Sequence, residues 1–548
     1  MTVSPEVSTD RVGLTVMLCA LLAACASSPE RVPGPEAPRT ENSVPKVEPS
    51  IAVTPPSGPV AAPVKPSLTR MEGPDASTKP PFGWRTLADA IGADPAKSLV
   101  AHIPPEINTL EAANPQLLDR LLNQWQGTQT GRFTVLHFGD SHVQGGFGAQ
   151  ITRHKLQAMA GSAGRGMVFP YSIAKTYSQN DYKSTFEGEW STANSIQVFP
   201  KMPLGVSGFV ARTSDVQAAF TLQFNQQFEP GGKILKIMYR ASSPGYLIRI
   251  QSGQWQYEAA AQAADSSPGG TQVLEMSLPQ LHDSIRFEMF NADPKADDWF
   301  EFFGLSIENP SPGVIYHNLG VGGAAYGALQ TQAYFESQSS VLSPDLVILD
   351  WGTNDLIYKN TVPESLQSTI VSTIRKVRAA HPQALIMLTT VQDTFFRRRP
   401  VTATAEFAQL VRRIAQENDC LLYDWYRVAG GRDAMRTWYA YGLALPDHVH
   451  LSGSGYAIKG ELLALAMLNA MAWRQHNPEA ASLWRDPMSK GQSTVSDWLK
   501  TQHPFQRRPD LIRVSASGKE ASGTSKTPAR KGAKNPVKHP PPPKPVVR

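Results

Sequence analysis

Two patterns of hydrophobic and polar residues follow one another along the middle of the chain. In residues 133–160 and again in 313–473, short continuous apolar runs alternate with longer stretches of helical periodicity. Such runs are typical of buried parallel strands, and strands that alternate with helices predict a parallel sheet between two helical layers. The predicted strands are 133–138, 313–318, 345–350, 384–391 and 421–423, and the predicted helices are 147–159, 363–380, 405–418 and 454–473.

The segment between the first two of these strands has a different pattern. Within residues 185–312 apolar residues alternate with polar ones, as at Leu274, Met276 and Leu278, and Gly- and Pro-rich clusters separate the runs. Alternation with period two indicates antiparallel strands that are buried on one face. We therefore expect a β-sandwich over 185–312, inserted into an α/β domain made of 83–184 and 313–480.

The beginning of the chain resembles an export signal. An apolar run over 12–24 is too short to span a bilayer, and it ends in Leu-Ala-Ala-Cys, which is similar to a bacterial lipobox. The resemblance implies that 1–25 is a signal peptide region cleaved before Cys25, and that the thiol of Cys25 receives a lipid. Ala26 at the next position then favours the outer membrane of a Gram-negative bacterium, with the protein facing the periplasm. Because Glu6 and Asp10 fit a signal peptide poorly, a start codon further downstream and an uncleaved leader both stay open.

Three further segments flank the predicted domains. Residues 26–82 contain 14 prolines and balanced charges, which predicts a disordered linker. Residues 481–513 are expected to form a helical extension, and 514–548 a disordered, Pro-rich tail. This tail has eight Lys or Arg residues against one acid and therefore holds more than the whole net charge of +5. The remaining body is close to neutral, which argues against a nucleic-acid partner.

The cysteine content limits the chemistry further. Only Cys19, Cys25 and Cys420 occur, so neither a disulfide framework nor a cysteine-based metal cluster is expected. Cys420 precedes apolar residues and is interpreted as a buried core thiol. No His, Asp or Glu spacing requires a metal, and we predict no metal and no cofactor.

Four short motifs follow predicted strands or precede the last helix. They are Gly139-Asp-Ser-His142, Asn318-Leu-Gly-Val-Gly-Gly323, Gly352-Thr-Asn-Asp355 and Asp447-His-Val-His450. A serine at a strand-to-helix turn exposes its hydroxyl, although a Gly-Asp-Ser tripeptide alone is a weak signal. In combination and in this order, the motifs resemble those of the SGNH (GDSL-like) hydrolases. The resemblance covers about 133–160 and 313–470 and implies a flavodoxin-like, three-layer α/β/α fold.

The chemistry of a serine esterase explains these residue types. The Ser141 hydroxyl needs a base, His450 can accept its proton, and Asp447 can orient the imidazole and stabilise its charged form. The oxyanion that forms on the substrate needs hydrogen-bond donors. The Asn354 amide and the backbone N–H groups of Gly323 and Ser141 can supply them, and the roles implied by the resemblance are the same. Gly323 is preferred over Gly322 and Gly320.

Other polar residues near these motifs have structural interpretations. Asp140 and Asp355 are alternatives for the acid, but each is expected to accept backbone N–H groups in a turn. His142 and His448 adjoin the site, with His448 at the surface, and His137 is expected to be a core histidine. Arg397–Arg399 is interpreted as a solvated loop, with contact to an anionic substrate as the alternative.

A second resemblance narrows the substrate. The Gly161-Ser-Ala-Gly-Arg-Gly-Met-Val-Phe-Pro170 segment, the β-rich insertion and the Gly-Asp-Ser-His start are similar to the peptidoglycan O-acetylesterase branch of the family. This implies a carbohydrate-binding-module-like insertion and an acetylated polysaccharide or peptidoglycan as substrate. A periplasmic lipase or thioesterase of the same fold and a non-catalytic glycan-binding lipoprotein are the rival hypotheses. Trp190, Trp255, Trp299 and Tyr246 are candidates for stacking on sugar rings.

Overall fold

The computed structural model describes residues 99–264, 270–485 and 493–501. The predicted signal segment with Cys25, the linker 26–82 and the tail 514–548 lie outside the described residues. All of the predicted hydrolase motifs and nearly all of the predicted insertion lie inside them.

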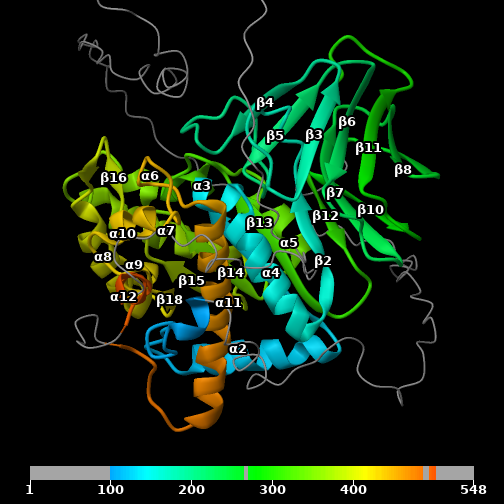
Figure 1. The fold of residues 1–548 in the computed structure, drawn as a ribbon. Helices are drawn as coiled ribbons and strands as arrows, with labels where there is room; N and C mark the ends of the chain where they lie inside the picture. The colour runs from blue at the N-terminus through cyan, green and yellow to red at the C-terminus, as the bar shows by residue number, and fades with distance from the viewer. Residues whose placement is uncertain (1–98, 265–269, 486–492, 502–548) are drawn as a thin grey trace, which may run out of the picture. The chain divides into compact units, whose positions relative to one another are not determined.

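The five parallel strands predicted from the apolar runs are all present and, with a sixth strand that the runs did not predict, form one side of an eleven-stranded sheet (Figure 1). In spatial order they are β2 (Ser162–Val168), β13 (Gly313–Gly320), β1 (Arg132–Gly139), β14 (Leu346–Asp350), β15 (Leu385–Thr389) and β18 (Leu421–Tyr423). Each neighbouring pair in this series runs parallel. Consequently the carboxyl ends of β1, β13 and β14 lie at the same edge of the sheet, as expected for a site built from loops after these strands.

Helices cover both faces of this parallel sheet. The predicted helices are observed as α4 (Phe147–Ala160), α7 (Glu364–Ala380), α8 (Ala403–Glu417) and α11 (Gly453–His476). Successive residues of β1 point to opposite faces: Phe133 and Val135 join a hydrophobic core with α4 and α11, whereas Leu136 and Phe138 join a core with α7 and α8. The expected three-layer α/β/α arrangement is therefore confirmed.

The remaining helices are short or peripheral. They are α2 (Gln116–Gln126), α3 (Ser141–Gln144), α5 (Phe335–Leu342), α6 (Thr353–Leu356), α9 (Trp425–Ala429), α10 (Ala434–Ala440) and α12 (Val495–Thr501), with 3-10 turns η1 (Leu99–His102), η2 (Gly127–Gln129) and η4 (Tyr326–Thr331). None of the described helices is long and apolar enough to cross a membrane.

The additional β-region consists of antiparallel strands, but one of its two sheets is continuous with the central sheet. The strands β12 (Phe300–Glu308), β7 (Lys233–Ala241) and β10 (Gln272–Leu278) extend this sheet beyond β2. In addition, β5 (Phe209–Thr213) pairs with β12, and β4 (Ser191–Asn194) pairs with β5. The second sheet has the order β3 (Tyr182–Glu187), β6 (Gln217–Phe224), β11 (Ser284–Asn291), β8 (Tyr246–Ser252) and β9 (Trp255–Ala260). A small hairpin, β16 (Phe395–Phe396) with β17 (Arg399–Pro400), stands apart from both sheets.

The two sheets of this β-region pack through aromatic side chains. Phe302 of β12 lies against Phe220 of β6, with ring centroids 4.9 Å apart, and Phe220 lies 4.9 Å from Phe287 of β11. The two sheets thus pack face to face, as in a sandwich, and their hydrophobic core is continuous with the one that contains Leu136 and Phe138 of β1. The predicted start of the sandwich at 185 falls inside β3, because the segment that leads into the sandwich begins to pair with β6 at Tyr182.

Strand β2 joins the parallel and antiparallel parts, and the hydrophobic pattern did not predict it. Its sequence, Ser-Ala-Gly-Arg-Gly-Met-Val, has no continuous apolar run because two glycines interrupt it. A side chain at Gly164 would place its Cβ 2.5 Å from the Cα of Glu308 on β12, and one at Gly166 would place it 2.5 Å from the carbonyl oxygen of Tyr316 on β13. Both residues also have positive φ angles. The glycines are therefore needed where two strands approach β2 closely.

The expected helical extension over 481–513 is only partly correct. Residues 481–485 are not helical, and Leu483 instead forms an isolated β-bridge with Ala112. The only helix in the described part of this segment is α12, and 502–513 lie outside the described residues.

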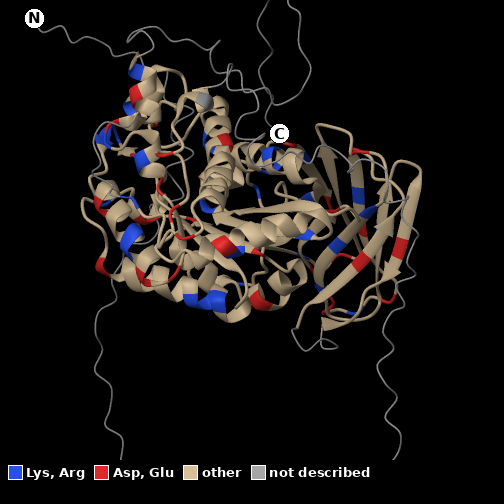
Figure 2. Ribbon diagram, turned by 90° about the horizontal axis from the view of Figure 1, so that it is seen from below, with Lys and Arg blue, Asp and Glu red and all other residues tan. Residues whose placement is uncertain are grey.

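On the ribbon, acidic and basic residues are interspersed over the described body (Figure 2).

Candidate active site

The serine predicted as nucleophile lies at the sharp turn after the central strand. β1 ends at Gly139, Asp140 caps α3 by accepting the N–H of His142 at 2.9 Å, and Ser141 is the first residue of α3. A Cβ at Gly139 would lie 2.3 Å from a methyl of Val143, so only glycine permits this turn to close. The turn holds the Ser141 side chain at the carboxyl edge of the sheet.

The loop before α11 places an imidazole within hydrogen-bond distance of that serine. The Nε2 atom of His450 lies 2.8 Å from Oγ of Ser141, and its Nδ1 atom lies 2.8 Å from Oδ2 of Asp447. The other oxygen of Asp447 accepts the backbone N–H groups of Val449 and His450 at 2.9 and 3.0 Å. The three residues predicted as catalytic therefore form one continuous hydrogen-bonded series.

The charges of this series are coupled. Burial by itself would lower the pKa of His450, but the hydrogen bond and negative charge of Asp447 raise it above the ordinary value. Burial would likewise raise the pKa of Asp447, whereas His450 and the two backbone N–H groups lower it to about 2. Asp447 is thus ionised at neutral pH and stabilises a protonated His450.

Two backbone donors adjoin the serine. The N–H groups of Gly322 and Gly320 are already engaged by side-chain oxygens of Gln144 and Asn318. Within the described residues, neither the N–H of Gly323 nor that of Ser141 has an acceptor. Gly323 has a φ of +90° and is exposed. Among the described residues, the N–H of Gly323 is therefore without an acceptor, unlike those of Gly320 and Gly322, and its role as an oxyanion donor stays a prediction.

The amide of Asn354 links the serine turn to the glycine loop. Its Nδ2 atom donates to the carbonyl oxygen of Ala324 at 2.9 Å and lies 3.3 Å from Oδ2 of Asp140. Asn354 therefore lies between the residue before Ser141 and the residue after Gly323.

The alternative acids have other partners. Asp140 accepts the N–H of His142 and contacts the Asn354 amide. It is 1% exposed, and burial raises its pKa to about 7. Asp355 accepts the N–H of Tyr326 at 3.3 Å, and burial raises its pKa to about 6. Each carboxylate braces a turn, as expected, and Asp447 is the carboxylate bonded to the His450 ring.

The buried ring of His142 packs beside the ring of His450. Its ring centroid lies 5.2 Å from that of His450, and its two nitrogens contact Tyr456 Oη at 2.9 Å and Gln392 Nε2 at 2.9 Å. Burial, followed by the charge of His450, lowers the pKa of His142 well below the ordinary value. Trp425 in turn donates to Oε1 of Gln392 at 3.1 Å. The neutral ring of His142 therefore packs beside the proposed base without competing with it for a proton.

Two glutamines with structural roles were not predicted. Gln392 orients His142, and Gln144 accepts the N–H of Gly322 while donating to the carbonyl oxygen of Tyr177 at 2.7 Å. The sequence offered one indication of the role of Gln144, which is its position three residues after Ser141 on α3. Nothing in the local pattern around Gln392 indicates its role, because its partners are distant in sequence.

The other polar residues singled out in the sequence lie outside the triad. His137 is buried and its Nδ1 atom lies 2.6 Å from Tyr316 Oη, as expected of a core histidine. His448 is half-buried between Phe395 and Tyr439 rather than fully at the surface. Cys420 is buried, and burial raises its pKa to about 12. The three arginines 397–399 are exposed on the β16–β17 hairpin.

Of the four aromatic residues proposed for sugar stacking, Trp255 alone is exposed, at the edge strand β9. Tyr246 is buried, Trp190 is half-buried against Phe220, and Trp299 is held between two arginine side chains. Among the described residues, no group of three or more His, Cys, Asp or Glu side chains is arranged to hold a metal ion.

Comparisons with known proteins agree with this fold and class. Residues 294–458 match the GDSL-like Lipase/Acylhydrolase family. The chain is similar in structure to a protein described as "Peptidoglycan O-acetylesterase in action, 5 min", with a TM-score of 0.54, 22% identity, and coverage of 68% of this chain and 99% of the other. A family two carbohydrate esterase from Cellvibrio japonicus is less similar, with a TM-score of 0.22, 11% identity, and coverage of 53% of this chain and 99% of the other. No curated protein sequence matches significantly.

These findings confirm two of the predictions. The mixed α/β fold with an additional β-sheet region is that of an SGNH-type hydrolase, and the family match supports an esterase or acylhydrolase. The substrate and the roles of the individual residues are treated as proposals.

Proposed function

We propose that this protein is a serine esterase that removes O-acetyl groups from a glycan of the bacterial cell envelope, with peptidoglycan as the favoured substrate. The observation that supports catalysis is the unbroken series from Ser141 through His450 to Asp447, with both hydrogen bonds at 2.8 Å. The motif resemblance and the likeness to a peptidoglycan O-acetylesterase support the choice of substrate.

In the proposed first step, Oγ of Ser141 attacks the acetyl carbonyl carbon and Nε2 of His450 accepts the hydroxyl proton. The negative charge on the carbonyl oxygen is stabilised by the N–H groups of Ser141 and Gly323 and by the Asn354 amide. The bond to the sugar oxygen then breaks, and His450 returns the proton to that oxygen. This leaves an acetyl-Ser141 ester and a free sugar hydroxyl.

In the second step, water attacks the acetyl-Ser141 carbonyl while His450 accepts one of its protons. The bond between the acetyl carbon and Oγ of Ser141 then breaks, His450 returns its proton to Oγ, and acetic acid leaves and ionises to acetate. Asp447 keeps His450 in the tautomer that presents a free Nε2 lone pair to Ser141, and it stabilises the imidazolium in both steps.

The test compares ester classes. Purified protein should release acetate from O-acetylated peptidoglycan faster than it hydrolyses long-chain acyl esters, and Ser141→Ala should abolish the release. A phenylmethanesulfonyl adduct on Ser141, identified by mass spectrometry, would establish the nucleophile independently of substrate. Preference for long acyl chains would favour a lipase or thioesterase, and glycan binding without turnover of any ester would contradict catalysis.

We further propose that the protein is exported and anchored through a lipid on Cys25, as the similarity to a lipobox suggests. Growth of the producing cells with labelled palmitate should label the wild-type protein and leave Cys25→Ala unlabelled. An unlabelled wild-type protein would refute the anchor.

A further inference from the structure

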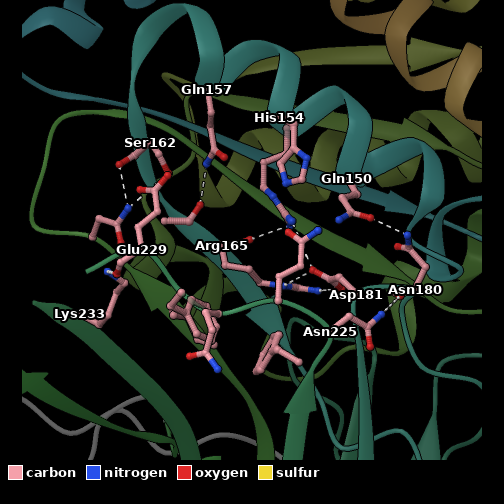
Figure 3. A pocket seen from close by; sticks show the side chains of 18 residues that line it. Gln150, His154, Gln157, Ser162, Arg165, Asn180, Asp181, Asn225, Glu229 and Lys233 are labelled. Carbon is pink, nitrogen blue, oxygen red and sulfur yellow. Dashed lines mark hydrogen bonds and ion pairs between the residues drawn. The ribbon is translucent and has the colours of Figure 1, made fainter. Parts of the chain in front are cut away.

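A polar cavity lies at the junction of the parallel and antiparallel parts of the sheet (Figure 3). Its volume is about 340 Å³. It lies between helix α4, strand β2 and the loop that follows β6. None of the proposed catalytic residues lines it.

One end of this cavity contains two arginines and a single carboxylate. Asp181 lies 2.6 Å from Arg165 and 3.3 Å from Arg153. Burial would raise the pKa of Asp181, but the two guanidiniums lower it to about 2, so it is ionised. One carboxylate balances only one of two buried cations, and this end of the cavity therefore has an excess positive charge.

The two arginines differ in how many of their donors are engaged. Arg165 donates to Asp181 through two nitrogens and also to Gln179 and to the carbonyl oxygen of Met167. Arg153, which is 6% exposed, donates only to the carbonyl oxygen of Arg165 at 3.2 Å and to Asp181, as far as the described residues show. A guanidinium has five N–H donors. Arg153 thus retains donors for a ligand, and a carboxylate matches their geometry.

The rest of the lining is rich in side-chain amides. Gln150, Asn180, Asn225 and Gln227 line the cavity. Asn180 donates to Gln150 at 2.5 Å, and Asn225 donates to the carbonyl oxygen of Asn180 at 2.7 Å, which fixes their orientation. The aromatic ring of Phe228 lies at the same cavity and is half-buried. Amides and an aromatic face suit the hydroxyl groups and apolar faces of a saccharide better than a purely apolar ligand.

A second hollow connects this cavity with the serine turn. It is lined by Gly145, Phe147 and Tyr177, and it shares Asn180 and Asn225 with the first cavity. The N–H of Asn180 donates to the carbonyl oxygen of Gly145 at 3.0 Å, directly after the helix that begins with Ser141. Phe147 and Tyr177 are 43% and 48% exposed. They provide ring surface between the proposed catalytic residues and the amide-rich cavity.

We propose that these two hollows together bind an acidic saccharide, with a carboxylate of the sugar chain paired to Arg153. The proposal rests on the proposed function in that the bound chain is the one whose acetyl ester reaches Ser141. A glycan of alternating N-acetylglucosamine and N-acetylmuramic acid supplies such a carboxylate on each muramic acid whose lactyl group carries no stem peptide, whereas chitin oligomers have the same backbone without it.

The experiment measures binding without turnover. In the Ser141→Ala protein, calorimetry compares a de-O-acetylated tetrasaccharide of alternating N-acetylglucosamine and N-acetylmuramic acid with chitotetraose. We expect the acidic tetrasaccharide to bind about tenfold more tightly at low salt, because a charge-assisted hydrogen bond accounts for roughly that ratio. The preference should decrease as salt is added.

Two variants in the Ser141→Ala background locate the site. Arg153→Met should reduce the preference to nearly one. Gln227→Glu adds a negative charge at an exposed position of the cavity and should also reduce the preference to nearly one. This second variant keeps the test valid if Arg153→Met does not fold. Gln116→Glu, at an exposed position on α2 that does not line the cavity, is the matched control and should keep the wild-type preference.

Equal affinity for the two tetrasaccharides, or a preference that survives in Gln227→Glu, would overturn this inference. Neither result concerns acetate release, because the ligands have no acetyl ester and the protein has no nucleophile. Conversely, a wild-type protein that binds the acidic tetrasaccharide but releases no acetate would contradict the proposed catalysis and leave the binding site intact.

Discussion

The parallel and antiparallel parts of the eleven-stranded sheet use their residues in different ways. In the parallel part, β1, β13 and β14 end at one edge, and the short loops after them contribute Ser141, Gly323 and Asn354. At the border of the antiparallel part, the cavity is lined by residues scattered over several elements. The proposed chemistry thus uses a few residues held at strand ends. The proposed binding of a glycan uses a surface to which several elements contribute.

The expected consequence is that changes at the parallel edge abolish activity without unfolding the protein, whereas changes at the junction reduce stability or binding first. The predictions below test this difference.

Ser141→Ala should have the largest effect. Removal of the nucleophile is expected to reduce kcat by about 10⁶-fold, the scale known for serine hydrolases. Acetate release from acetylated glycan measures the loss, and a melting temperature within about 2 °C of wild type would show that the fold persists. Residual activity within 100-fold of wild type would exclude Ser141 as the nucleophile.

Asp447→Asn should have the second largest effect. We expect kcat to decrease by about 10⁴-fold, because His450 loses the partner that fixes its tautomer. The base must be neutral, so activity falls as pH decreases through its pKa. Since Asp447 raises the pKa of His450, the acidic limb of kcat/KM should have its midpoint above the usual histidine value of about 6.5 in the wild type. The midpoint should move to lower pH in the variant. A midpoint that does not move would mean that another group controls the limb.

Asn354→Ala should reduce kcat by about 10²–10³-fold, the effect of removing one oxyanion donor. KM should change little, because the interaction strengthens in the transition state. Asn354 also holds Ala324, so the melting temperature must be measured alongside. An equal loss of kcat in Gln330→Ala, an exposed amide on η4, would indicate a general disturbance rather than loss of a donor.

Gly166→Ala tests the junction. Its Cβ would lie 2.5 Å from the carbonyl oxygen of Tyr316, and its φ of +86° is unfavourable for alanine. We expect the free energy of unfolding to decrease by about 1–3 kcal/mol. Gly327→Ala is the control, because nothing lies within 4 Å of its Cβ position, and it should leave stability within about 1 kcal/mol. Chemical denaturation measures both, and equal midpoints would show that β2 is not tightly constrained.

Much of the α/β part could be predicted, because its information is local. The apolar runs at 133–138 and 345–350 became buried strands, and the stretch 454–473 became α11. The residues of the proposed triad also lie in short motifs, and the order of these motifs resembles that of the SGNH hydrolases. Ser141 and His450 are 309 positions apart, and parallel strands that end at a common edge explain how they meet.

What the sequence did not reveal depends on contacts between distant segments. The glycine-rich β2 lacks an apolar run, and it is a strand because β12 and β13 supply its hydrogen-bond partners on both sides. For the same reason the sandwich could not be recognised as an extension of the central sheet. Gln392 illustrates the same point at the site, since its partners His142 and Trp425 lie far from it in the chain.

By itself, therefore, the amino-acid sequence indicated most of the buried parallel strands and the four motifs that contain the proposed reactive groups, because periodicity and turn chemistry are properties of neighbouring residues. The tertiary structure decided which donors around Ser141 stay free, how the two β-regions join, and that Arg153 keeps unused donors beside a single shared carboxylate. These outcomes depend on burial and on partners brought together from remote parts of the chain, and no local pattern encodes them.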